Sequence, residues 1–428
     1  MNQAAATKWM KLDNAAKIYP AAMSRGWMAL FRVSATLDEP VDPAILQTAL
    51  DDTLRRIPSF AQRLRQGFFW HYLEHISERL LIQKDVGNPC VRMNLKHNNG
   101  YMLRVRYHEN RIAIEMFHVL ADGSGALCFL KTLVARYIDL KYDEAIPRGG
   151  DILDCAHEPA PDESEDAFMR YARGMRRSRS EPAAYQIPGL PEDHFLHITT
   201  GVIDLTEALE LAKSCKATLT EFLTAVLILA IDEIQTTYVP NRKKHMPIQI
   251  GIPVNLRKFY KTRTVRNFSS YINAGIEPKY GKYQLEDTIR HVHGLMAAEL
   301  DEKLINAKFS TNVLSERNKA IRVVPLFIKR QMMKAIFELR GDRQTTTILS
   351  NLGSVHLPEP MQKHVRRVDC MLGPLKRNRV GCCCAGYNNQ LILNFTRKIK
   401  EPHVERGFFR MLVRLGLHVT IESNQRWS

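Results

Sequence analysis

A strand that leads directly into a turn and a helix, between residues 112 and 140, constrains the fold of this chain most strongly. Alternate residues of a strand share one face, which here carries Ile112, Ile114, Met116 and His118. His118 is therefore the last side chain of an apolar face, where the strand ends. Asp122 and Gly123 follow at the turn, and apolar residues at helical spacing predict a helix that Ser124 caps. The stretch predicts a mixed α/β fold with a histidine at a strand-to-helix corner.

The same mixture of strands and helices continues along 428 residues, a length sufficient for two domains. Further strands are expected at 27–37, 101–107, 195–204, 248–254, 345–349 and 391–396, and helices at 42–57, 218–231 and 405–417. Residues 141–197 are rich in proline and carry an acidic cluster, which is typical of a connection between domains. We therefore expect an N-terminal half at 1–155, a linker at 156–195 and a C-terminal half at 196–428.

The composition narrows the class of protein. A hydrophobic content of 45% and a charged content of 25% are those of a globular protein, and no apolar run reaches membrane-spanning length. The N-terminus lacks a signal-peptide pattern, so the expected location is the cytoplasm. The net charge of +16 favours acidic partners such as nucleotide phosphates, an acidic carrier protein or an anionic membrane surface. Nucleic acid ranks last because no nucleic-acid motif is present.

The eight cysteines are scattered, and none has the spacing of a metal or redox site. Three of them, Cys382, Cys383 and Cys384, are consecutive in a predicted strand. We expect small apolar packing residues in a reducing compartment, with no metal site and no catalytic thiol. A cysteine-dependent thioester hydrolase is therefore a minor alternative.

The spacing of His118, Asp122 and Gly123 resembles the HxxxDG motif of the coenzyme-A-dependent acyltransferase superfamily. This superfamily includes chloramphenicol acetyltransferase, alcohol acetyltransferases, wax ester synthases and the condensation domains of peptide synthetases. Many members have a second histidine before the catalytic one, where this chain has Phe117. The resemblance implies two chloramphenicol-acetyltransferase-like halves, each a mixed sheet packed with helices, with the active site in a tunnel between them.

A second segment is also similar to this superfamily. Residues 253–257 read Pro-Val-Asn-Leu-Arg, and Asn-Phe follows ten residues later. In the superfamily, a comparable segment supplies an arginine that pairs with the motif aspartate. By position, that arginine is Arg257, so we expect Asp122 and Arg257 to form an ion pair that braces the two halves. Asp122 could instead act directly on the imidazole, as in a catalytic triad.

Three further polar residues are expected at the substrate. Asn267 belongs to the second motif segment, and Ser350 and Asn351 form a turn that resembles one near the substrate tunnel of relatives. Acyl transfer requires a hydrogen-bond donor for the developing oxyanion, and Ser350 and Asn351 are the candidates.

The resemblance implies transfer of an acyl group from acyl-CoA, or from a carrier-protein thioester, to a hydroxyl or amine. We expect an alcohol O-acetyltransferase with His118 as general base, Asp122 and Gly123 beside it, acyl-CoA as co-substrate and no bound cofactor. An acidic acyl carrier protein is the alternative donor, and contact with a membrane surface stays open. The alternative from another class is a non-catalytic, condensation-like binding module, to which the missing second histidine gives weight.

Overall fold

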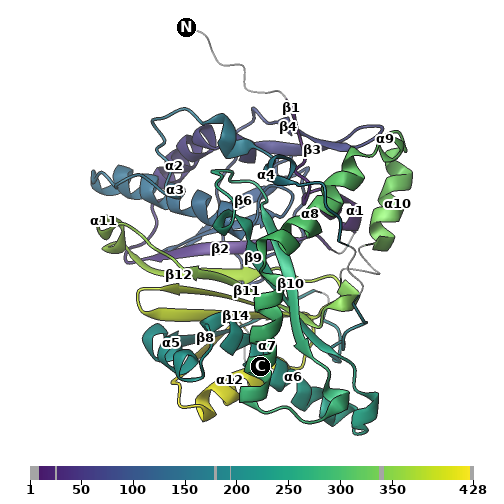
Figure 1. Ribbon diagram of the computed structural model, residues 1–428. Helices are drawn as coiled ribbons and strands as arrows, with labels where there is room; N and C mark the ends of the chain where they lie inside the picture. The colour runs from purple at the N-terminus through teal and green to yellow at the C-terminus, as the bar shows by residue number, and fades with distance from the viewer. Residues whose placement is uncertain (1–8, 25–26, 178–180, 193, 337–341, 425–428) are drawn as a thin grey trace.

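Two mixed sheets covered by helices make up most of the protein, and a small third sheet lies beside the first (Figure 1). The computed structural model describes residues 9–24, 27–177, 181–192, 194–336 and 342–424. Each large sheet has its own core of buried side chains. The predicted architecture of two helix-packed mixed sheets is confirmed.

The first sheet has the strand order β12-β2-β7-β6-β5 and is antiparallel except between β5 and β6. Its strands are β2 (Leu30–Leu37), β5 (Gln83–Lys84), β6 (Leu103–His108), β7 (Arg111–Phe117) and β12 (Val365–Leu372). Helix α3 (Gly123–Tyr142) packs on β2 and β7, and α2 (Pro43–Arg56) packs on α3. Helix α3 is capped by Asp122 rather than by Ser124, since Oδ1 of Asp122 accepts the backbone N–H of Gly125 at 3.0 Å.

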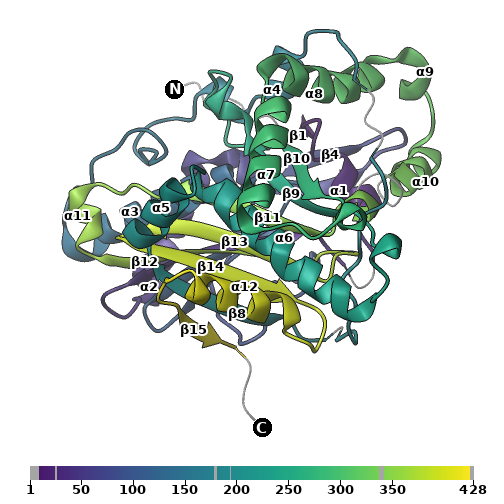
Figure 2. The same cartoon turned by 60° about the horizontal axis from the view of Figure 1, so that its bottom comes forward.

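The second sheet has the strand order β10-β9-β11-β13-β14-β8-β15. Its strands are β8 (His197–Asp204), β9 (Ile248–Asn255), β10 (Ser269–Ile276), β11 (Thr347–Ser354), β13 (Val380–Tyr387), β14 (Gln390–Arg397) and β15 (Thr420–Ser423). Helix α6 (Leu219–Tyr238) packs between α7 (Leu285–Glu299), α12 (His403–Arg414) and α5 (Leu205–Ser214), as Figure 2 shows. Thr218 and Glu221 form a capping box at the start of α6, which fixes where this buried helix begins.

The small sheet is antiparallel and consists of β1 (Trp9–Lys11), β3 (Gln62–Gln66) and β4 (His71–His75). The other helices are α1 (Ile18–Ala22), α4 (Ala167–Tyr171), α8 (Glu302–Arg317), α9 (Lys319–Arg322), α10 (Leu326–Ile336) and α11 (Glu359–Gln362). Short 3-10 turns lie at η1 (Pro58–Phe60), η2 (Pro161–Ser164), η3 (Arg242–Lys244), η4 (Leu256–Lys258), η5 (Pro278–Tyr280) and η7 (Asp342–Gln344). Helices α8, α9 and α10 extend along one edge of the molecule, beside the small sheet (Figure 1).

One strand joins the two halves. β12 comes late in the chain, yet it pairs with β2 of the first sheet, with Val368 opposite Ala35. The strands before and after it, β11 and β13, pair in parallel in the second sheet. The chain therefore leaves the second sheet, completes the first and returns. The boundary at residue 196 stays a prediction, and the structure adds this crossing strand to it.

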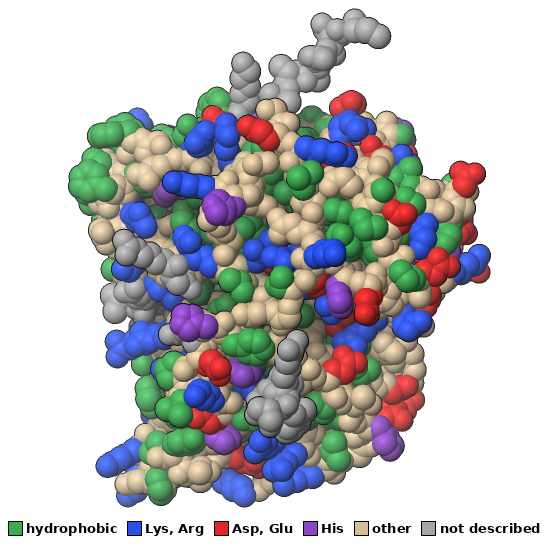
Figure 3. All heavy atoms as spheres, turned by 180° about the vertical axis from the view of Figure 1, so that it is seen from behind, with side chains coloured by type: hydrophobic (Ala, Val, Ile, Leu, Met, Phe, Trp, Pro, Cys, Tyr) green, Lys and Arg blue, Asp and Glu red, His purple; other side chains and the backbone are tan. Residues whose placement is uncertain are grey.

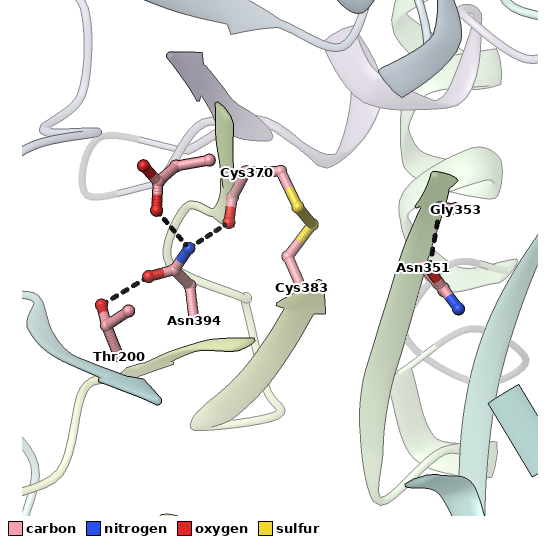
Figure 4. The surroundings of a disulfide bond; sticks show 7 residues. Thr200, Asn351, Gly353, Cys370, Cys383 and Asn394 are labelled. Atoms are coloured by element: carbon pink, nitrogen blue, oxygen red, sulfur yellow. Dashed lines mark hydrogen bonds between the residues drawn. A yellow bond between two sulfur atoms is a disulfide. The ribbon is translucent and has the colours of Figure 1, made fainter. Parts of the chain in front are cut away.

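A disulfide also links the two sheets, which corrects our expectation for the cysteines. Cys370 of β12 and Cys383 of β13 are bonded, with their Cα atoms 5.8 Å apart (Figure 4). Beside them, Nδ2 of Asn394 donates to the carbonyl of Cys370 at 2.9 Å (Figure 4). These cysteines come together only because the two sheets approach one another, so no local sequence pattern predicts their pairing. A structural disulfide also weakens the inference of a reducing compartment.

In the described part of the chain, no single helix is long and apolar enough to cross a membrane. Helices α5 and α6 pass that test only when taken together, and they meet at a bend of 81°. Helix α6 is largely buried between other helices, as expected for the core helix of a domain.

We expect the Cys370–Cys383 disulfide to stabilise the protein by about 2–4 kcal/mol, because it closes a loop in the unfolded chain. Reductant should lower the denaturant midpoint of the wild type and leave that of Cys370→Ser unchanged. Cys215→Ser, which alters an unpaired cysteine, should keep the wild-type response to reductant. Equal midpoints for oxidised and reduced wild-type protein would contradict this prediction.

Candidate active site

A large cavity lies between the two halves. It has a volume of about 1810 Å³ and is lined by His118 and Asp122 from the first half and by Ile252, Ser350 and Asn351 from the second. Sites for one small molecule usually measure about 300–1,000 Å³. The space is therefore large enough for two substrates at once.

His118 follows directly after β7 and faces this cavity. Its backbone N–H donates to the carbonyl of Ala29 at 2.9 Å, which holds the turn against the start of β2. The imidazole stacks on Tyr19 at a centroid distance of 4.7 Å and contacts the ring of Phe31 at 5.1 Å. Burial lowers the pKa of His118, although the nearby Asp122 carboxylate acts in the opposite direction. The imidazole is therefore neutral at pH 7 and able to accept a proton.

Asn267 fixes which nitrogen of His118 carries the proton. Nδ2 of Asn267 donates to the backbone carbonyl of His118 at 3.0 Å and to the carboxylate of Asp13 at 3.2 Å. Its Oδ1 is therefore an acceptor, and it lies 3.0 Å from Nδ1 of His118. The network assigns the proton to Nδ1 and leaves the lone pair on Nε2. Within the described residues Nε2 has no hydrogen-bond partner. Asn267, expected at the substrate, thus lies behind the imidazole.

Asp13 supports this arrangement from the N-terminal segment, which the sequence analysis did not connect to the site. Its side chain is fully buried and accepts the backbone N–H of Ala16 at 2.7 Å. Burial raises the pKa of Asp13, and the guanidinium of Arg266, 3.6 Å away, partly offsets this effect. Tyr19 belongs to the same segment and stacks on His118. No local pattern could have shown that these residues meet a histidine about a hundred positions later.

Asp122 and Arg257 form the predicted pair. Nη1 of Arg257 donates to Oδ2 of Asp122 at 2.9 Å, and the backbone N–H of Phe268 donates to the same oxygen at 2.7 Å. The other carboxylate oxygen caps α3. Burial acts to raise the pKa of Asp122, but the Arg257 guanidinium and these hydrogen bonds hold it below its ordinary value. Both oxygens of Asp122 thus bond to protein groups other than His118, which favours the structural role over a triad.

Helix α3 packs tightly against the segment that carries Asn267. A Cβ atom on Gly125 would lie 1.9 Å from the carbonyl oxygen of Val265, so only glycine fits there. At Gly123, a Cβ would lie 2.9 Å from the side chain of Leu352, a contact that a flexible side chain can relieve. Gly125, which the sequence analysis did not single out, is therefore the stricter requirement for joining the halves.

Ser350 and Asn351 of β11 both line the cavity. The amide of Asn351 is occupied, since its Nδ2 donates to Oγ1 of Thr220 at 3.0 Å. Its Oδ1 accepts the N–H of Gly353 at 2.8 Å (Figure 4). The hydroxyl of Ser350 has no hydrogen-bond partner among the described residues. Of the two candidates, Ser350 is thus the one with a donor free to reach a ligand.

Comparisons with known proteins relate part of the sequence to a family and the whole fold to solved structures. Residues 168–369 match the family model described as alcohol acetyltransferase, and no curated protein matches significantly. Polyketide synthase associated protein 5 from Mycobacterium tuberculosis has a TM-score of 0.64 at 17% identity, over 94% of this chain and 96% of that one. For trichothecene 15-O-acetyltransferase from Fusarium sporotrichioides, the TM-score is 0.59 at 10% identity, over 97% and 96%. A mutant starter condensation domain of rhizomide synthetase in complex with C8-CoA has a TM-score of 0.61 at 12% identity, over 96% and 95%.

These structures share one fold along nearly the whole chain. The chain has the fold of these acetyltransferase and condensation-domain structures, and its residues 168–369 match the alcohol acetyltransferase model. His118 lines the cavity between the two halves, as the resemblance to the HxxxDG motif implied. The identities are low, so the roles of individual residues depend on the geometry described above.

We predict that Asp122→Asn and Arg257→Gln each destabilise the protein by roughly 3–5 kcal/mol, because each leaves an uncompensated buried partner. The double variant should be no less stable than the less stable of the two single variants, because both substitutions remove the same interaction. Denaturant unfolding measures all three. The exposed pair of Arg263 and Asp162 provides the control, because Arg263→Gln should change stability little. Simple additivity of the two core substitutions would show that Asp122 and Arg257 do not interact.

We predict that the rate of a reaction in which His118 accepts a proton falls at acid pH with a midpoint below 6.5, roughly the ordinary pKa of histidine. The reason is that burial lowers the pKa of His118 and favours its neutral form. Asn267→Ala should move this midpoint lower still, since Asn267 acts to raise the pKa of His118. It should also lower kcat by about tenfold to a hundredfold through misplacement of the ring. A loss of rate with an unmoved midpoint would indicate that Asn267 only supports the fold.

Proposed function

We propose that this protein transfers an acyl group from acyl-CoA to the hydroxyl or amine of a small acceptor, with His118 as the general base. The preferred reaction is the O-acetylation of an alcohol. One observation carries the proposal: His118 lines a cavity that can hold two substrates, its Nδ1 bonds to Asn267, and its Nε2 has no hydrogen-bond partner among the described residues. The match to alcohol acetyltransferases supports the choice of acceptor.

The chemistry needs one base and no covalent enzyme intermediate. Nε2 of His118 takes the proton of the acceptor hydroxyl while its oxygen attacks the thioester carbonyl carbon. The new C–O bond forms, the C–S bond breaks, and the imidazolium returns the proton to the departing thiolate. The products are an ester and free coenzyme A. For the oxyanion, we assign the hydroxyl of Ser350 as donor, because it lines the cavity without another partner.

The charge of the cavity suits a coenzyme A donor. Its lining includes nine Lys or Arg residues and three Asp or Glu residues, so it attracts a phosphate-bearing ligand. The rhizomide synthetase domain named above was solved with C8-CoA, which supports acyl-CoA as donor here. A polyketide synthase associated protein is among the structural neighbours. A carrier-protein thioester therefore stays the alternative acyl donor.

The missing second histidine favours a non-catalytic binding module only if that position faces the substrate. Phe117 stands there, and its side chain is fully buried in the core of the first half. It is not among the described residues that line the cavity. The substitution therefore changes core packing and leaves the face of His118 that meets the cavity intact.

We predict that His118→Ala lowers thiol release from acyl-CoA by roughly two to four orders of magnitude without unfolding the protein. His71 is the matched control, because it also lines the cavity. Burial and the charge of Arg330 lower the pKa of His71 to about 4, and His71→Ala should keep most of the activity. The readout is thiol release with a panel of alcohols and amines. Near-wild-type release by His118→Ala, or an equal loss in His71→Ala, would overturn the assignment of the base.

A further inference from the structure

Hydrophobic side chains gather on the surface where the β3–β4 hairpin meets α9 and α10. We call this surface the aromatic patch, and its exposed members are Phe68, Phe69, Trp70, Ile321, Val323, Phe327, Ile328 and Met332. Phe68, Val323 and Phe327 are 70%, 69% and 67% exposed. In Figure 3, which views the molecule from behind, the edge formed by α9 and α10 lies on the left, where hydrophobic and basic side chains alternate. An exposed apolar surface of this kind marks an interaction site.

The patch is built from two elements that bond to one another. The backbone N–H of Leu326, at the start of α10, donates to the carbonyl of Phe68 at 2.9 Å. Nζ of Lys329 donates to the carbonyl of Phe69 at 3.1 Å and lies 4.9 Å from the ring centre of Trp70. The hairpin tip and α10 therefore present their apolar side chains on one supported surface.

The charged side chains on α9 and α10 have one sign. Residues 317–336, which include α9 and α10, contain six Lys or Arg and no Asp or Glu. Within the described residues, none of these six forms an ion pair with a carboxylate. A short basic helix that exposes Phe, Ile and Met beside Lys and Arg has the composition of an element that lies in a membrane interface. Lysine and arginine there meet lipid phosphates, while the aromatic rings enter the headgroup region.

The patch also surrounds an opening of the active-site cavity. Phe69, Trp70, Ile321 and Met332 are exposed to solvent and line the cavity that contains His118. If a bilayer is bound to the patch, a ligand that leaves the bilayer there would therefore enter the cavity without crossing water.

We propose that the aromatic patch docks this protein on anionic lipid bilayers. The occupant we infer is a membrane surface rather than a protein, because the patch combines large apolar side chains at a hairpin tip with basic side chains that have no carboxylate partner among the described residues. Docking itself does not depend on the reaction. A second part, that the bilayer delivers a lipophilic acceptor or acyl-CoA to His118, rests on the proposed acyltransferase function.

The test uses vesicles of phosphatidylcholine with and without phosphatidylglycerol, in flotation with the full-length protein. Wild-type protein should float with the anionic vesicles only, and high salt should release it. Two double variants separate the contributions: Phe68→Ser with Phe327→Ser, and Arg330→Glu with Lys334→Glu. Each should weaken binding by roughly tenfold or more. None of these four residues lines the cavity, so thiol release with a water-soluble acceptor should stay at the wild-type level.

The matched control lies away from the patch. Tyr280 on η5 is 76% exposed, and Lys282, two residues later, is also exposed. Tyr280→Ser with Lys282→Glu removes the same kinds of side chain and should bind vesicles like the wild type.

Three results would overturn docking: no flotation of wild-type protein, equal flotation with neutral vesicles, or unchanged flotation of both patch variants. The wild type could instead sediment as a dimer and fail to bind vesicles, while the Phe68/Phe327 variant sediments as a monomer. That result would assign the patch to a second copy of the chain. Binding of an acidic carrier protein without vesicle binding would assign it to that protein. Flotation without thiol release by the wild type would support docking and reject the proposed function, so the two failures are distinguishable.

Discussion

The carboxylate of Asp122 is the point on which the arrangement of the two halves depends. It begins α3 of the first half, accepts the backbone N–H of Phe268 from the second, and pairs with Arg257. A buried carboxylate without these donors would be costly, so the three contacts are mutually required. Because Asn267 directly precedes Phe268, the same contact that satisfies Asp122 also places the amide that orients His118.

The strand and helix around His118 and the pairing of Asp122 with Arg257 could be predicted from the sequence. The strand that ends at His118 and the helix after it follow from local hydrophobic periodicity, and β7 and α3 confirm them. The pairing of Asp122 with Arg257 spans 135 positions, and only the resemblance to a known superfamily indicated it. Local pattern chose Ser124 as the cap of α3, but the carboxylate of Asp122 takes that place because it already lies at the junction of the halves.

The features that the sequence did not reveal share one cause, since each arises from packing between distant segments. Tyr19 stacks on His118, and Asp13 accepts a hydrogen bond from Asn267, because the N-terminal segment crosses the junction. Cys370 and Cys383 bond because β12 leaves one sheet to complete the other. Gly125 is required by the carbonyl of Val265, which no pattern near residue 125 contains. Periodicity describes faces of single elements, whereas these contacts depend on how two complete sheets approach one another.

The position of the disulfide bears on how the cavity keeps its shape. Cys370 and Cys383 both line the cavity, and they tie the crossing strand to the second sheet on the side of Ser350. Asp122, Arg257 and the segment before Phe268 join the halves beside His118. The proposed general base and the proposed oxyanion donor come from different halves, so their separation is set by these two connections rather than by either half alone. A reaction that needs both groups around one carbonyl carbon requires that both connections hold at the same time.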